Sequence, residues 1–178
     1  ACSGAPSDAV ALALLGFVKE KVDLVVSGVN PHYNIGQDVT YSGTVTAAIE
    51  AVITGLPGIA ISTELESPRD YDTAGNVAAE VARHVSAHGL PAGVLLNVNV
   101  PPGEIKGVQI TRQGRRVYRD ELVERRDPRG RPYYWIGGEM PTGVNAPGTD
   151  FWAVTNGEVS VTPLQIDLTA RDVIPTLE

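Results

Sequence analysis

The apolar and polar positions between residues 22 and 55 predict a strand, a polar loop and a helix. Residues 22–26 form a short, largely apolar run that is typical of a buried parallel strand, and the run stops at Ser27-Gly28. The loop that follows is rich in polar side chains. Apolar residues then recur at helical spacing, which predicts a helix from about Gly43 to Gly55; they are Val45, Ala48, Ile49, Val52 and Ile53.

Further helices and strands are predicted on both sides of this segment. A first helix begins at Pro6, which suits a first helical turn, and its apolar side consists of Ala11, Leu14, Leu15 and Val18. Strands are predicted at 59–61, 94–100 and 108–111, and a long helix at 70–88. Because strands alternate with helices, the sequence predicts an α/β fold in which a mostly parallel sheet lies between two helical layers.

The last third of the chain is predicted to be rich in β-structure. Residues 115–140 resemble a long, protruding hairpin, with a turn at Asp127-Pro128-Arg129-Gly130. Residues 152–154 and 159–161 are predicted to be two strands around Asn156-Gly157, followed by a C-terminal tail from Asp167. We therefore expect one domain over residues 1–178, with a β-rich C-terminal appendage.

Charge and cysteine content exclude several classes of protein. The net charge of −7 disfavours binding of a nucleic-acid polymer over the whole surface. Residues 112–131 depart from this balance, since eight arginines stand there against four acidic residues. Cys2 is the only cysteine, which excludes a disulfide framework and a thiolate metal cluster. No apolar stretch reaches transmembrane length, so we expect no membrane association and a cytoplasmic location.

The start of the helix near residue 43 is the predicted ligand site. Ser42 is a competent N-cap, and the amides of Gly43 and Thr44 have no partner inside the helix. Free amides at the positive end of a helix dipole form an anion site, and phosphate is its common occupant. Asn30 follows the strand at its carboxyl end, where open α/β sheets bind their ligands.

Each of these residues also has a purely structural interpretation. Ser42 can be a plain N-cap beside a packing glycine, and Asn30 can cap the backbone of its own loop. Asn34 and Gly36 shape the loop either around a substrate or as a simple turn. Asp38 is expected at the surface. The arginine-rich hairpin can contact nucleotide phosphates of a neighbouring subunit or be a solvated arm, and we favour a contact in an oligomer, assisted by its aromatic residues.

Several motifs resemble the SurE family in order and spacing, over nearly the whole chain. They are residues 4–10 (GAPSDAV), 23–30 (DLVVSGVN), 41–45 (YSGTV), 56–62 (LPGIAIS), 96–101 (LNVNVP), 111–113 (TRQ) and 133–135 (YYW). The resemblance implies a Rossmann-like fold with a hairpin used in oligomerisation. It implies a metal-dependent phosphatase that acts on nucleoside 5′- and 3′-monophosphates with Mg²⁺ or Mn²⁺.

The resemblance also assigns roles to particular residues. The family's metal ligands are an Asp-Asp pair, a serine and the asparagine that ends the Ser-Gly-x-Asn strand, and only the last falls on this chain, at Asn30. Ser42, Gly43 and Thr44 are implied to hold the phosphate, and from its place in the loop we also predict Asn34 to bind the substrate. Asn30 and Ser42 are therefore the predicted catalytic residues, and Asn30 is also the predicted metal ligand.

Two departures from the family pattern affect this prediction. The chain contains no Asp-Asp pair, which we expect to precede Ala1 in a longer polypeptide. Ala5 replaces a threonine before Pro6, which removes an N-cap worth about 1 kcal/mol. We therefore expect a nucleotidase that forms a homodimer or homotetramer through residues 115–140, and we expect residues 1–178 alone to be inactive. The alternatives are a phosphate- or nucleotide-binding fragment without catalysis and a mainly structural oligomerisation unit.

Overall fold

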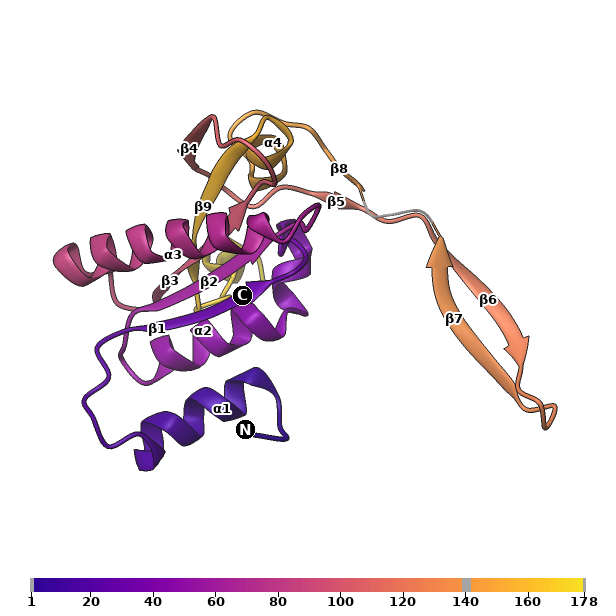
Figure 1. Cartoon of the computed structure of the whole chain (residues 1–178), viewed down its shortest axis with the longest axis horizontal. Helices are drawn as coiled ribbons and strands as arrows, with labels where there is room; N and C mark the ends of the chain where they lie inside the picture. The colour runs from indigo at the N-terminus through magenta and orange to yellow at the C-terminus, as the bar shows by residue number, and fades with distance from the viewer. Residues whose placement is uncertain (1, 139–141, 178) are drawn as a thin grey trace.

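A computed structural model describes residues 2–138 and 142–177. Within these residues, five strands form the main sheet, in the order β1-β2-β3-β9-β4 (Figure 1). Neighbouring strands are parallel except for β3 and β9. The strands are β1 (Val25–Asn30), β2 (Gly58–Thr63), β3 (Val94–Val100), β4 (Gly107–Ile110) and β9 (Glu158–Gln165).

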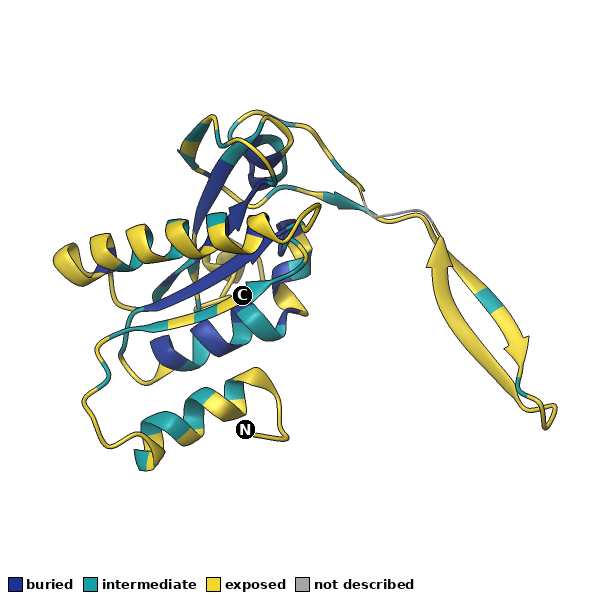
Figure 2. Cartoon of the chain, in the orientation of Figure 1, coloured by how far each residue is buried: buried dark blue, intermediate teal, exposed yellow. Residues whose placement is uncertain are grey.

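Helices cover both faces of this sheet, and the core lies on either side of β2. Side chains of β2 alternate, so Ile59 and Ile61 pack toward α3 (Arg69–His88) while Ala60 packs toward α2 (Gly43–Ile53). Figure 1 shows α3 and α2 on opposite sides of the strands, with α1 (Pro6–Leu12) beyond α2. All six residues of β2 are buried, as expected for a central strand (Figure 2). The three-layer α/β arrangement is confirmed.

The strand before the loop lies later in the chain than its apolar run predicts. It spans Val25–Asn30 and not residues 22–26, because it continues through Gly28. Gly28 has φ of +133°, and a Cβ there would stand 2.3 Å from the carbonyl oxygen of Ile61 on β2. Glycine alone allows this close approach. The strand consequently delivers Asn30 directly to the edge of the sheet, opposite Ser62.

Residues 152–154, predicted to be a strand, form the middle of a helix, α4 (Asp150–Thr155). Thr149 begins this helix, since its Oγ accepts the N–H of Trp152 at 3.3 Å. Asn156 and Gly157 end it, with Gly157 at φ +79°, so the Asn-Gly pair is a helix terminus and not a hairpin turn. The following strand, β9, pairs with β3 and β4 inside the main sheet. The prediction of a separate β-rich C-terminal appendage is therefore wrong.

The predicted hairpin is present and extends away from the sheet (Figure 1). Strands β6 (Asp120–Arg126) and β7 (Pro132–Gly138) pair from Asp120↔Gly138 to Arg126↔Pro132, and almost all their residues are exposed (Figure 2). At its base, β5 (Arg116–Val117) pairs with β8 (Thr142–Gly143). Residues 139 and 140, at the end of the predicted range, lie outside the described residues.

The ends of the chain contain shorter elements. After α1, a π-helical turn (Ala13–Phe17) ends near Gly16, and Leu15 of the predicted apolar side is 86% exposed. The predicted C-terminal tail holds a 3₁₀ turn (Arg171–Val173) and α5 (Ile174–Leu177). No helix in the described part of the chain is long and apolar enough to cross a membrane.

Candidate functional site

The loop between β1 and α2, residues 31–42, is fixed to the sheet through Asn34. The backbone N–H of Asn34 donates to Asn99 Oδ1 at 2.9 Å, and its Nδ2 donates to Ser62 Oγ at 2.6 Å. Its carbonyl oxygen accepts from the side-chain amides of Asn97 (2.8 Å) and Asn99 (3.0 Å). These groups are all buried. Asn34 thus holds the loop against the carboxyl ends of β2 and β3. Open α/β sheets bind their ligands at this edge.

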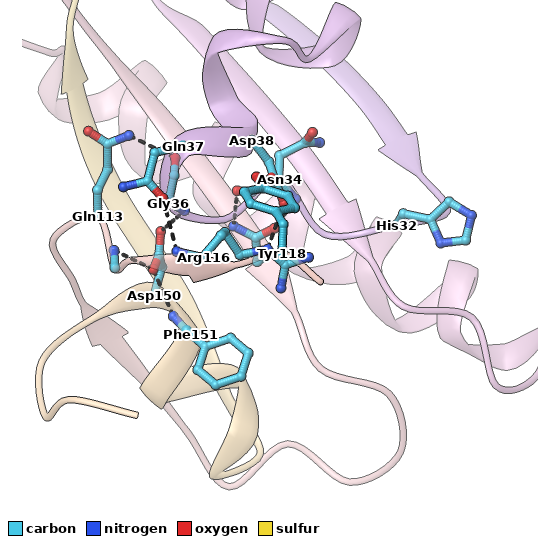
Figure 3. A network of polar contacts seen from close by, with 12 residues as sticks. His32, Asn34, Gly36, Gln37, Asp38, Gln113, Arg116, Tyr118, Asp150 and Phe151 are labelled. Carbon is cyan, nitrogen blue, oxygen red and sulfur yellow. Dashed lines mark hydrogen bonds and ion pairs between the residues drawn. The ribbon is translucent and has the colours of Figure 1, made fainter. Parts of the chain in front are cut away.

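A second anchor of this loop is Asp150, at the start of α4. Its carboxylate accepts three backbone N–H groups, from Gly36 (2.8 Å), Gly114 (2.7 Å) and Phe151 (2.7 Å). Figure 3 labels Asp150 with two of these partners, Gly36 and Phe151. Burial raises the pKa of Asp150 above its ordinary value, while these three donors lower the pKa in part. Gly36 has φ of +55°, and a Cβ there would stand 2.8 Å from the carbonyl oxygen of Gly114. The loop is therefore held tightly against the base of the hairpin.

A third set of contacts joins the loop to β5 and the residue that follows it. Arg116 Nε lies 2.8 Å from Asp38 Oδ2, although the angle at nitrogen is not that of a hydrogen bond. The hydroxyl of Tyr118 donates to Asp38 Oδ1, and this bond raises the pKa of Tyr118 (Figure 3). Asp38, expected at the surface, is in fact partly buried and ion-paired.

Ser42 begins α2 as predicted. It is buried, and its Oγ accepts the N–H of Val45 at 3.1 Å. The hydroxyl hydrogen of Ser42 is not used in this bond, because the oxygen is the acceptor. Gly43 also packs closely, since a Cβ there would meet Pro6 Cγ at 3.1 Å. The N-cap and the packing glycine are both present, and they leave the amides of Gly43 and Thr44 in the first helical turn. Phosphate binding at these two residues stays a prediction.

Asn30 lies at the end of β1, where its side chain supports its own loop. Its Nδ2 donates to the carbonyl oxygen of His32 at 2.5 Å, which is the structural role considered for it. This bond uses the amide nitrogen, so Oδ1 is the atom that could serve a cation or water. His32 itself points away from the network in Figure 3, and its Nδ1 lies 3.1 Å from Glu64.

The structure gathers several predicted site residues around one pocket of about 850 Å³. Asn30, Asn34 and Ser42 line it, while Gly43 and Thr44 are not among the described residues that do so. Sequence reasoning missed five further lining residues, which are Tyr33, Tyr41, Tyr118, Asp120 and Ile136. Tyr118, Asp120 and Ile136 belong to the hairpin region, and only the folded structure shows that they lie near the loop. The pocket is large enough for a small organic ligand.

The described residues do not by themselves form the divalent-metal site that the resemblance implies. No group of three or more His, Cys, Asp or Glu among them could hold a metal ion. Asn30 offers one uncharged oxygen, and the nearby Asp38 carboxylate already contacts Arg116 and Tyr118. Mg²⁺ and Mn²⁺ bind through charged oxygen ligands. The described residues therefore supply only a part of such a site.

Fold and pocket together define an α/β protein with a pocket beside the start of α2. The family model "Survival protein SurE" matches residues 1–120. The chain is 48% identical to the 5′-nucleotidase SurE of Herpetosiphon aurantiacus, over 99% of this chain and 71% of the relative. It is 47% identical to the 5′-nucleotidase SurE of Chloroflexus aggregans, over 96% of this chain and 69% of the relative. The SurE protein from Aquifex aeolicus superposes with a TM-score of 0.82 at 41% identity, over 98% of this chain and 72% of that protein. The chain belongs to the SurE family.

Proposed function

We propose that the pocket beside α2 binds nucleoside monophosphates and hydrolyses them to nucleoside and phosphate. The observation that carries this proposal is the capped start of α2, whose Ser42 lines the same pocket as Asn30. The names of the relatives, 5′-nucleotidase SurE, support the substrate class. Activity on 3′-monophosphates and dependence on Mg²⁺ or Mn²⁺ are finer parts of the proposal that rest on the family resemblance alone.

The residues of this chain would act mainly on the phosphate. The amides of Gly43 and Thr44, with the positive end of the α2 dipole, offset the negative charge of the phosphoryl oxygens. The Ser42 hydroxyl hydrogen donates to one of these oxygens while Oγ keeps its bond to Val45. Asn30 would contribute Oδ1 to a divalent cation, which neutralises phosphoryl charge and activates water when bound.

The test is phosphate release from nucleoside 5′- and 3′-monophosphates, with Mn²⁺ or Mg²⁺ and again with EDTA. We expect release with the metals and none with EDTA. We expect Asn30→Ala to lower kcat strongly while the protein still folds and unfolds cooperatively, with at most a small loss of stability from the bond to His32. Release that is insensitive to EDTA would refute the metal dependence. Normal turnover of the Asn30 variant at saturating metal would remove Asn30 from the site.

The second candidate function is nucleotide or phosphate binding without hydrolysis. It is favoured by one observation, the lack of an acidic metal-binding group among the described residues. The two functions are separated by measuring the binding of adenosine 5′-monophosphate alongside phosphate release. Binding that saturates with no release in either metal would support the second function and exclude the first for this polypeptide.

We also propose that the hairpin joins copies of the chain into a homodimer or homotetramer. Support comes from its large exposed apolar side chains, which are Leu122 (68% exposed), Tyr134 (57%), Trp135 (59%) and Ile136 (80%). A two-stranded hairpin without a covering layer is only marginally stable in water. A partner that buries these side chains would stabilise it.

A further inference from the structure

The pocket beside α2 is lined by two chemically different groups of side chains. Asn30, Asn34 and Ser42 are polar and come from the end of β1, the loop and the start of α2, and the carboxylates of Asp38 and Asp120 also line the pocket. Tyr41, Tyr118 and Ile136 present aromatic and aliphatic surface. A volume of about 850 Å³ exceeds what a phosphate group alone needs. Pockets for small organic ligands are mostly apolar with a few polar groups that fix orientation.

Tyr41 stands directly before the phosphate-binding residues and has an exposed ring. Its side chain is 88% exposed, while its backbone N–H donates to the carbonyl oxygen of Asp38 at 3.0 Å. The main chain at Tyr41 is therefore fixed and its ring is in contact with solvent. An exposed aromatic ring beside a phosphate site is suited to contact the organic part of a phosphate ester.

Tyr118 reaches the same pocket from the base of the hairpin, and its ring is held in place. Its hydroxyl donates to Asp38, whose carboxylate also pairs with Arg116 (Figure 3). The backbone N–H of Arg116 in turn donates to Gln37 Oε1 at 2.9 Å. These bonds orient the ring, and Tyr118 as a whole remains 45% exposed. A ring restrained in this way loses little conformational freedom when a ligand binds.

We propose that Tyr41 and Tyr118 form the nucleoside subsite of this pocket and contact the nucleobase by stacking, with Ile136 as apolar support. The inference rests on the proposed function, since the phosphate at the start of α2 fixes where the base lies. Stacking on aromatic side chains tolerates every base, because each has a π-face. The subsite therefore favours nucleotides over sugar phosphates without selecting strongly among bases.

The test compares ligands that share a phosphate and a ribose but differ in the base. Affinity is measured for adenosine 5′-monophosphate, uridine 5′-monophosphate, ribose 5-phosphate and inorganic phosphate, as KM where phosphate is released and as Kd otherwise. The variants are Tyr41→Ala, Tyr41→Phe, Tyr118→Leu and Tyr118→Phe. Tyr71→Ala is the control, because Tyr71 is about as exposed as Tyr118 (42% against 45%) but lies on α3 and outside the pocket. Tyr41 is exposed enough that its removal leaves the fold intact.

We expect Tyr41→Ala and Tyr118→Leu each to weaken binding of both nucleotides about tenfold. Ribose 5-phosphate and phosphate should bind as before, and Tyr41→Phe and Tyr71→Ala should retain the preference for nucleotides. Tyr118→Phe keeps the ring but loses the bond to Asp38, so its loss should be smaller than that of Tyr118→Leu. Equal losses for nucleotides and ribose 5-phosphate, or no loss for either, would overturn the subsite while leaving phosphate binding established. A wild-type chain that binds none of the four ligands would instead overturn the proposed function, and the subsite with it.

Discussion

Ser42 caps α2 and is proposed to bind phosphate, and a single substitution can separate these two roles. Its Oγ accepts the N–H of Val45, so Ser42→Ala should lower the free energy of unfolding by about 1 kcal/mol through loss of the N-cap. Glycine at an N-cap costs only a few tenths of a kcal/mol. Ser42→Gly should therefore keep most of the stability but weaken phosphate binding, because the hydroxyl donor is gone.

The measurement is a denaturant titration of both variants, together with competition by inorganic phosphate. Ser42→Thr, which keeps a hydroxyl, is the control and should keep both properties. If Ser42→Gly binds phosphate as well as the wild type, Ser42 is only a cap and does not belong to the site.

Two opposing effects, burial and hydrogen bonding, act on the pKa of the Asp150 carboxyl. Asp150→Asn removes an acceptor and presents an amide N–H₂ to one of the three backbone N–H donors, which should cost about 1–3 kcal/mol. Burial, the larger effect, raises the pKa of the folded-state carboxyl above that of the unfolded chain. Its contribution to stability is then complete below the ordinary Asp pKa and is lost as the pH rises through the raised folded-state value.

The stability difference between the wild type and Asp150→Asn should consequently be larger near pH 3.5 than near pH 7. Urea midpoints of both proteins at the two pH values test this. A difference that shrinks on acidification would mean that the backbone donors outweigh burial and that the pKa is lowered instead.

At the scale of elements, replacement of glycine by alanine should change stability in opposite directions at Gly28 and Gly75. Gly28→Ala in β1 would place a Cβ 2.3 Å from the Ile61 carbonyl oxygen at a φ of +133°, and we expect a loss of about 1–3 kcal/mol. Gly75 lies inside α3 with no atom within 4 Å of its ideal Cβ. Gly75→Ala should stabilise the protein by about 0.5–1 kcal/mol through helix propensity.

Thermal or urea unfolding of the two variants is sufficient to check the opposite signs. Because Gly28 precedes Asn30 in β1, its variant should also disturb the pocket, whereas the Gly75 variant should bind ligands normally. Equal stability of Gly28→Ala and the wild type would show that β1 can shift away from β2 at this point.

Elements with long periodic patterns were predictable from the sequence, and short apolar runs were not. The spacing of Val45 to Ile53 gave α2 nearly to its bounds, and the pattern of residues 70–88 gave α3. Residues 152–154 are too few to distinguish a strand from a helix, and Asn156-Gly157 suits a hairpin turn or a helix end equally. The Thr149-Asp150 pair was the N-cap signal that could have decided it.

The candidate site was predictable where it is local and unpredictable where it depends on distant segments. Ser42 and Asn30 follow from the positions of a helix start and a strand end. The anchors of the loop join residues 63 positions apart in the case of Asn34 and Asn97, and 114 apart in the case of Gly36 and Asp150. Tyr118 likewise enters the pocket from a hairpin 80 positions beyond Asp38. The local spacing of apolar residues does not predict contacts between residues so far apart in the chain.

At the scale of the whole molecule, residues at the base of the hairpin also contact the loop beside the pocket. Gln113 Nε2 donates to the carbonyl oxygen of Gly36 at 3.0 Å, and the Arg116 N–H donates to Gln37 Oε1. The segment that leads into the hairpin is thus bonded to the loop beside the pocket. If copies of the chain assemble through the hairpin, the partner's position is transmitted to the orientation of Tyr118 through these bonds.

Assembly through the hairpin is tested by charge placed on its exposed apolar faces. In the β6–β7 ladder Leu122 stands opposite Ile136 and Val123 opposite Trp135, so Leu122 and Trp135 lie on different faces. The double variant Leu122→Lys/Trp135→Lys should lower the mass measured by analytical ultracentrifugation to that of the monomer, because charge is costly in an apolar interface. Ile53→Lys, at an exposed position (63%) at the end of α2, is the control and should keep the wild-type mass.

An oligomer that is unchanged in the double variant, and also after deletion of residues 120–138, would exclude the hairpin as the contact. A monomer that still distinguishes nucleotides from ribose 5-phosphate would show that Tyr118 is held by Asp38 alone and needs no partner.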